Sequence, residues 1–233
     1  MSQNKIKILY IGGFGRSGST LIDVMLGKIP AFFSAGELFW LWKRGLKENQ
    51  LVGDGHPFNE SPFWQEVGQI AFGGFDKINV DHVLKLSDSV NHLSLIPRMN
   101  DPGKRDAAFN ASHSELTEIL TRLYRAIQQV SGCEIIVDSS KNPPYGFLLN
   151  SISDFEVSML HLVRDSRAVA HSWQRQKVRP EIHWQKQFMP TFSPQKSARN
   201  WLVNNTVMHR FKRVNPKYLF MRYEDFVERP ADH

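Results

Sequence analysis

The chain has 233 residues, 41% of them hydrophobic and 12% aromatic, which is enough to bury the core of one large domain or two small ones. Its formal charge of +6 is unevenly placed: residues 161–233 hold 14 Lys and Arg against 6 Asp and Glu, a net +8, and residues 1–160 carry a net −2. Because the basic residues do not form a run, we expect a small polyanionic ligand and no nucleic acid. A single cysteine excludes an intrachain disulfide, and no apolar run reaches the roughly 18 residues of a membrane span. Because residues 1–5 lead directly into a strand pattern rather than a signal peptide, we expect a soluble, cytoplasmic protein.

The N-terminal segment predicts one strand, one glycine-rich turn and one helix. Residues 5–11 fill with Ile, Leu and Tyr, as in a buried strand that ends at Gly12-Gly13. Residues 17–27 place apolar side chains on one helical face, and Pro30 follows as a stop. Backbone N–H groups at the start of such a helix have no partner within it, so the turn predicts an anion site.

The next 85 residues or so are less regular. Residues 31–45 are aromatic, and we expect Phe39, Trp40 and Trp42 to pack in a core rather than to line a pocket. Residues 45–115 read as an insertion with short helices near 61–72 and 81–90. An insertion of this kind either carries specificity for an acceptor substrate or is a variable surface loop.

Strands alternate with helices over the rest of the chain. A capping box of Ser112 and Glu115 predicts the start of a helix that ends at Gly132. We expect further strands at 133–138, 157–163 and 218–222, and helices at 167–177 and after Ser193-Pro194. This order predicts one α/β domain, a three-layer sandwich around a mainly parallel sheet, with ligands bound just after residues 11, 138, 163 and 222. His161 falls inside the third of these four strands, so we expect it to be a packed residue.

The glycine-rich turn admits three interpretations. Gly13, Gly15 and Gly18 fit the GxGxxG of dinucleotide-binding proteins, but the segment before the required acidic residue, Glu37, is a poor strand. The same residues fit a Walker A frame in which Ser19 replaces the lysine that contacts the β- and γ-phosphates. A third interpretation is a sulfate or phosphate loop with one cation in its centre, Arg16.

The third interpretation resembles sulfotransferases that use 3′-phosphoadenosine 5′-phosphosulfate (PAPS). Their 5′-phosphosulfate loop has a basic residue followed by Ser-Gly-Ser/Thr-Thr/Ser. The resemblance implies that the 5′ end of PAPS is bound by Gly15, Arg16, Ser17, Gly18, Ser19 and Thr20. The family's 3′-phosphate motif, an Arg at a strand end and a Ser eight residues later, is similar to Arg164 and Ser172.

The resemblance extends to catalytic positions. Glu37, 21 residues after Arg16, is placed like the catalytic glutamate of the tyrosylprotein and bacterial branch, and Lys141 lies in a segment that supplies a catalytic lysine. Pro143 stands where the cytosolic branch has its catalytic histidine, so Glu37 is the expected base. Tyr223, after the last strand, is implied to lie near the nucleotide.

Two departures from the family pattern accompany the resemblance. An arginine expected four residues after Ser172 is Gln176, and either neighbour, Arg175 or Lys177, would replace it. The resemblance covers residues 5–230, and we expect the single domain to lack the family's C-terminal part.

The resemblance implies a P-loop NTPase-like sulfotransferase fold and transfer of a sulfuryl group from PAPS to a hydroxyl or amine, with Arg16, Glu37 and Lys141 catalytic and no metal required. The acceptor remains open among small molecules, glycans and peptides, and so does the oligomeric state. The alternative is a P-loop-like nucleotide-binding protein, a kinase or NTPase, without sulfotransferase activity.

Overall fold

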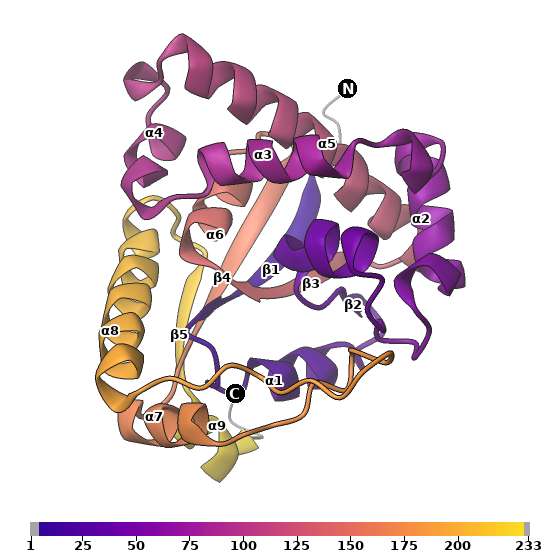
Figure 1. The fold of residues 1–233 in the computed structure, drawn as a ribbon. Helices are drawn as coiled ribbons and strands as arrows, with labels where there is room; N and C mark the ends of the chain where they lie inside the picture. Colours follow the sequence, from indigo (N-terminus) through magenta and orange to yellow (C-terminus); the bar gives the residue numbers. More distant parts are fainter. Residues whose placement is uncertain (1–4, 231–233) are drawn as a thin grey trace.

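The computed structural model describes residues 5–230, which are built around a single five-stranded sheet (Figure 1). The strands are β1 (Ile6–Gly13), β2 (Phe32–Ser34), β3 (Ile135–Lys141), β4 (Phe155–Val163) and β5 (Tyr218–Arg222). They lie in the order β2-β3-β1-β4-β5, and every neighbouring pair is parallel. The prediction of a mainly parallel α/β sheet is therefore confirmed.

Helices cover both faces of the sheet and make three layers (Figure 1). Alternate strand residues face opposite layers, since side chains in a strand repeat every two residues. Ile8 and Tyr10 of β1 join the larger core, whereas Ile11 joins a smaller core with Ile22 and Phe226. The helices are α1 (Ser19–Leu26), α2 (Pro62–Phe72), α3 (Val80–Val90), α4 (Ile96–Asn100), α5 (Ala107–Ser131), α6 (Pro143–Asn150), α7 (Ser166–Gln174), α8 (Pro194–Arg210) and α9 (Tyr223–Glu228).

The insertion folds as helices against α5 (Figure 1). Both predicted pieces are present, as α2, which is capped by Ser61, and α3, which is capped by Asn79. The short α4 and a π-helical segment at Leu41–Lys47 were not predicted. The π-helical segment follows the aromatic stretch and forms one wall of the site described below.

Two helix starts and one strand differ from the prediction for identifiable physical reasons. Helix α5 begins at Ala107, because the Asp106 side chain accepts a 2.8 Å hydrogen bond from the Phe109 amide, and Ser112 lies inside the helix. Helix α1 begins at Ser19 rather than residue 17, because Gly18 has a φ of 90° and cannot continue a right-handed helix. The sheet contains β2, a three-residue edge strand that was not counted among the four predicted strands.

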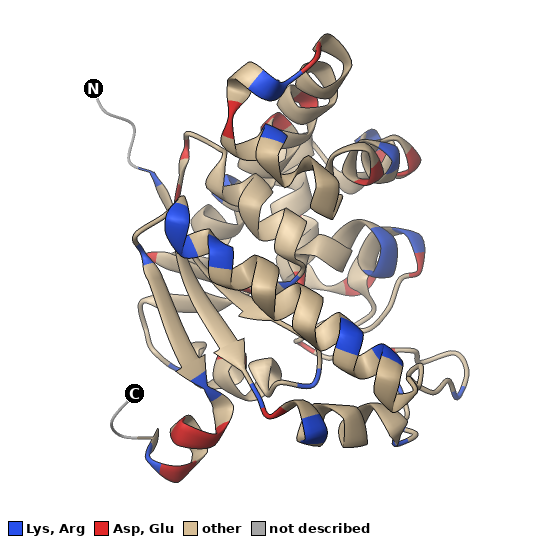
Figure 2. Cartoon of the chain, turned by 90° about the vertical axis from the view of Figure 1, so that its left-hand side faces the viewer, with Lys and Arg blue, Asp and Glu red and all other residues tan. Residues whose placement is uncertain are grey.

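Basic residues are spread along the face that carries α8. Figure 2 shows Lys and Arg spaced apart there among uncharged residues, while the short helix next to the C-terminal end carries Glu and Asp. Within residues 5–230, no helix has the length and apolar character that a membrane span requires.

Candidate active site

The predicted site residues follow the carboxyl ends of parallel strands, which all lie at one edge of the sheet. Arg16 follows β1, Glu37 follows β2, Lys141 ends β3, Arg164 follows β4 and Tyr223 follows β5. Strand β1 has β3 on one side and β4 on the other, so this edge is a topological switch point.

Two of these residues have unusual backbone conformations. Among the described residues, three that are not glycine have positive φ angles, and they include Arg16 at 71° and Lys141 at 63°. A left-handed conformation costs a side-chain-bearing residue about 1 kcal/mol or more, and such strain is concentrated at functional sites. The surrounding fold thus holds both cations in set positions.

The loop after β1 has the features of an anion site. The amide N–H groups of residues 15–20 find no hydrogen-bond acceptor among the described residues. Ser17 is 1% exposed, and its Oγ likewise has no partner there. A buried hydroxyl without a partner costs free energy, about 1–3 kcal/mol, that a bound anion would recover. Ser19 is also buried, and Thr20 is exposed at the first turn of α1.

The Arg16 side chain packs against the Trp173 ring and the Met189 side chain. Its guanidinium is 4.8 Å from the centre of the Trp173 ring, and Nη2 is 2.9 Å from the Met189 sulfur. Burial lowers the pKa of Arg16 from its ordinary value, and the residue remains a cation at neutral pH. The Arg16 side chain thus packs against α7 and the following segment, 175–193.

Arg164 contacts both the loop after β1 and Tyr223, which follows β5. Its Nη1 donates a 3.2 Å hydrogen bond to the Arg16 carbonyl, and its guanidinium lies 4.8 Å from the centre of the Tyr223 ring. A Cβ on Gly18 would lie 2.2 Å from Tyr223 Cε2, so only glycine allows this contact. The structure therefore brings Arg16, Gly18, Arg164 and Tyr223 together.

The other residues predicted on this side lie on α7 and beyond it. Ser172 is half-buried on α7, next to Trp173. Arg175 and Lys177 follow the end of that helix and are both exposed. No hydrogen bond connects these three side chains to the described part of the loop.

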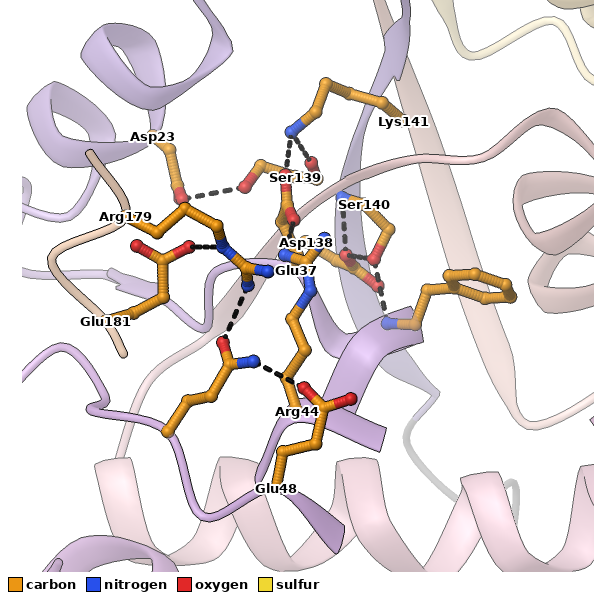
Figure 3. A network of polar contacts seen from close by, with 12 residues as sticks. Asp23, Glu37, Arg44, Glu48, Asp138, Ser139, Ser140, Lys141, Arg179 and Glu181 are labelled. Carbon is orange, nitrogen blue, oxygen red and sulfur yellow. Dashed lines mark hydrogen bonds and ion pairs between the residues drawn. The ribbon is translucent and has the colours of Figure 1, made fainter. Parts of the chain in front are cut away.

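Glu37 lies between two cations (Figure 3). Lys141 Nζ is 2.5 Å from Glu37 Oε1, and Arg44 Nη1 is 2.7 Å from Oε2. Burial raises the pKa of Glu37, but the attraction of Lys141 and Arg44 more than offsets it, so the pKa lies below its usual value. Glu37 is therefore a carboxylate at neutral pH.

The end of β3 is fixed by a buried polar network that the sequence did not reveal. Asp138 accepts a 2.5 Å hydrogen bond from the Tyr124 hydroxyl and further ones from the Ser140 amide and hydroxyl. Ser140 Oγ in turn accepts a 2.9 Å hydrogen bond from the Phe39 amide, which follows Glu37 closely in the chain. The network links the segments that carry Glu37 and Lys141.

A cavity of about 750 Å³ opens beside Glu37. Its walls include Asp23 of α1, Trp40 and Arg44 of the aromatic segment, and Phe63 of the insertion. The prediction that Trp40 packs only in a core was thus wrong, whereas Trp42 is 3% exposed and belongs to the core. Asp23 was not predicted as a site residue, because one acid inside a helix gives no sequence signal.

His161 is a packed residue, as predicted. It is 1% exposed and hydrogen-bonds the Tyr218 hydroxyl at 2.6 Å and the Asn205 side chain at 3.0 Å. Burial lowers its pKa to about 4, so the ring is neutral. No group of three or more His, Cys, Asp or Glu within residues 5–230 is arranged to hold a metal ion.

Comparisons with known proteins give two findings. A family model described as "Sulfotransferase family" matches residues 9–233. Among solved structures, a sulfotransferase domain from the curacin biosynthetic pathway is similar, with 18% identity, a TM-score of 0.48, and coverage of 97% of this chain and 69% of that one. No curated protein sequence matches the chain.

Proposed function

Since the chain belongs to the sulfotransferase family, we propose that it transfers a sulfuryl group from PAPS to a hydroxyl or amine of an acceptor. The observation that carries this proposal is the pairing of two anion-binding elements: the loop with the buried, unpartnered Ser17 hydroxyl, and Arg164 bonded to the Arg16 carbonyl. PAPS has an anion at each end of its nucleotide, and one element would serve each end.

The loop would hold the 5′ end of the donor. Free N–H groups of residues 15–20 and the Ser17 hydroxyl supply neutral donors, and the positive end of the α1 dipole adds to them. Arg164 and Ser172 would hold the 3′-phosphate, and Tyr223 would lie against the nucleotide. The buried Ser17 hydroxyl, which has no partner among the described residues, supports binding of the phosphosulfate end of the donor here.

Glu37 would act as the general base. The acceptor oxygen forms a bond to sulfur as the bridging S–O bond of the donor breaks, and the acceptor proton passes to Glu37. Its lowered pKa keeps Glu37 ionised but makes it a weak base while both cations are present. Displacement of Lys141 toward the donor would raise the pKa of Glu37 at the moment the proton moves.

Lys141 and Arg16 would stabilise the leaving group, 3′,5′-adenosine bisphosphate. Charge develops on the oxygen that bridged phosphate and sulfate, and preorganised cations are most effective where charge develops. Both residues have strained backbones, Lys141 at the end of β3 and Arg16 within the anion loop that follows β1.

The cavity beside Glu37 would bind the acceptor. Because residues 50–64 supply part of its wall, the insertion would contribute to acceptor specificity. An acceptor hydroxyl bound there would lie next to the proposed base, and the donor would approach from the anion loop.

Calorimetry and a transfer assay test the function together. We expect 3′,5′-adenosine bisphosphate to bind more tightly than ATP or NAD, and labelled sulfate to pass from PAPS to members of an acceptor panel. Tighter binding of ATP or NAD would overturn the proposal. Binding of the bisphosphate with no transfer to any acceptor would indicate a nucleotide-binding module.

A further inference from the structure

The cations that line the cavity beside Glu37 are either paired with a carboxylate or exposed to water. Arg44 is committed to Glu37, and the cation next to Glu181 is Arg179, 2.9 Å away (Figure 3). Among the described lining residues, Lys28 is the one cation outside an ion pair, and its side chain is exposed to water, which screens it.

Two lining carboxylates, by contrast, have no Lys or Arg partner among the described residues. Asp54 accepts hydrogen bonds from the Ser61 hydroxyl at 2.5 Å and the His56 amide at 3.0 Å, and its only ionic neighbour is the His56 ring. Asp23 accepts one from the Ser139 hydroxyl at 2.9 Å. An anion entering the cavity would therefore lie near two carboxylates that have no Lys or Arg ion-pair partner among the described residues.

Asp23 also has a free acceptor atom. The residue is 6% exposed, its Oδ2 is occupied by Ser139, and its buried Oδ1 has no partner among residues 5–230. Burial raises the pKa of Asp23 from its usual value by more than the Ser34 and Ser139 hydroxyls and the charge of Lys141 lower it. Such a group favours a ligand that donates a hydrogen bond.

The remaining wall is largely aromatic. Phe33 and Phe63 stack with ring centres 4.7 Å apart, and Trp40 is half-buried with the Arg44 guanidinium 4.5 Å from its ring centre. These rings offer flat apolar surface to a ligand, in a wall that also contains the carboxylates of Glu37 and Asp23.

We propose that this cavity selects an uncharged or cationic acceptor with an aromatic or other apolar body, and that Asp23 Oδ1 accepts a hydrogen bond from it. The inference rests on the proposed function, because it assigns the acceptor class of the same site. It also has a consequence for turnover: the sulfated product carries a negative charge that the cavity does not compensate, which favours its release.

A matched pair of phenols tests the charge preference. Tyramine and 4-hydroxyphenylacetate carry the same reacting hydroxyl, with an ammonium on one and a carboxylate on the other. Calorimetry with 3′,5′-adenosine bisphosphate present should give tyramine at least about tenfold tighter binding, and the kcat/KM for sulfate transfer from PAPS should follow the same order. Equal or tighter binding of 4-hydroxyphenylacetate, or no binding of tyramine at millimolar concentration, overturns the inference.

Variants test the part assigned to Asp23. Asp23→Asn should weaken tyramine binding about tenfold without weakening that of 4-hydroxyphenylacetate, while Asp88→Asn, on an exposed part of α3, should change neither. If circular dichroism shows that Asp23→Asn is unfolded, Asp54→Asn tests the charge effect instead. This variant should also reduce the ratio of tyramine affinity to 4-hydroxyphenylacetate affinity. An unchanged ratio in every folded variant overturns the assignment.

The binding measurement separates this inference from the proposed function. If PAPS transfers no sulfate to either phenol and the bisphosphate does not bind, the proposed function fails. The ratio of tyramine to 4-hydroxyphenylacetate binding, measured without nucleotide, would still decide the charge preference of the cavity. If transfer occurs but favours the anionic phenol, the function stands and the inference fails.

Discussion

Lys141 Nζ lies 2.5 Å from Glu37 Oε1, although 104 positions separate the two residues in the chain. The contact joins the carboxyl end of β3 to the segment that follows β2, and its side chains are 15% and 31% exposed. An ion pair that is only partly buried adds little to stability after screening. Its position at the switch point, with Lys141 in a strained conformation, points instead to a role in the site.

Glu37→Gln tests the base directly. The amide keeps the shape of the side chain but cannot take a proton, so turnover should fall by about 100-fold or more while binding of 3′,5′-adenosine bisphosphate is retained. Glu66→Gln, on an exposed part of α2, is the matched control and should leave both unchanged. A loss of less than about tenfold in the Glu37 variant would remove this residue as the base.

Arg44→Gln should move the pH profile. A base must be deprotonated, so kcat/KM falls as pH drops through the pKa of Glu37. Arg44 holds that pKa down, and its removal raises the pKa, which shifts the acid limb to higher pH. Arg213→Gln, far along the chain on an exposed turn, should leave the limb in place. An unmoved limb in the Arg44 variant would show that another group titrates.

Arg164→Ala tests the 3′-phosphate site. The wild-type protein should bind 3′,5′-adenosine bisphosphate more tightly than AMP, and the variant should bind the two about equally. A charge-assisted hydrogen bond contributes about 1.5–3 kcal/mol, so the expected loss for the bisphosphate is about ten- to a hundredfold. Arg213→Ala again controls for the loss of one positive charge. If Arg164→Ala weakens bisphosphate and AMP binding equally, Arg164 does not contact the 3′-phosphate.

The parallel sheet was predictable because its strands carry strong local signals. β1, β3 and β4 contain several Ile, Leu, Val or Phe residues next to glycine turns or capped helices, and the structure shifts their predicted ends by three residues at most. β2 was missed because it has three residues and depends on pairing with β3 rather than on its own pattern. The start of α5 was missed because the capping box at Ser112 was taken as the start, whereas Asp106 caps the helix and Ser112 lies inside it.

Site residues next to strand ends were predictable from the sequence. Site residues whose place depends on contacts between distant parts of the chain were not. Arg16 and Arg164 lie next to strand ends, so the topology alone brings them close. The ion pair between Arg44 and Glu37 follows from how the π-helical segment packs. The place of Asp23 in the cavity wall follows from how α1 packs. No known spacing of residue types in the sequence predicts either feature. Asp138 is a similar case: it was read as the end of a strand, whereas the structure makes it a buried centre of hydrogen bonding.

We expect Asp138 to make the free energy of unfolding depend on pH. Burial raises its pKa from an ordinary 3.8 to about 6 in the folded protein. Between these values the folded state holds a proton that the unfolded state releases, so this group's contribution is complete below about pH 4 and is lost as pH rises to about 6. The loss approaches about 3 kcal/mol, since each pKa unit corresponds to about 1.4 kcal/mol.

Asp138→Asn removes the titration and keeps the shape, so the variant isolates this contribution. We expect the free energy of unfolding of the wild type, minus that of Asp138→Asn, to decrease as pH rises from about 4 to about 6 in urea titrations followed by circular dichroism. Carboxylates with lowered pKa values, such as Glu37, act in the opposite direction but are common to both proteins and cancel in the difference. A difference that stays flat over this range would mean that the pKa of Asp138 is not raised in the folded state, because the hydrogen bonds from Tyr124 and Ser140 offset its burial.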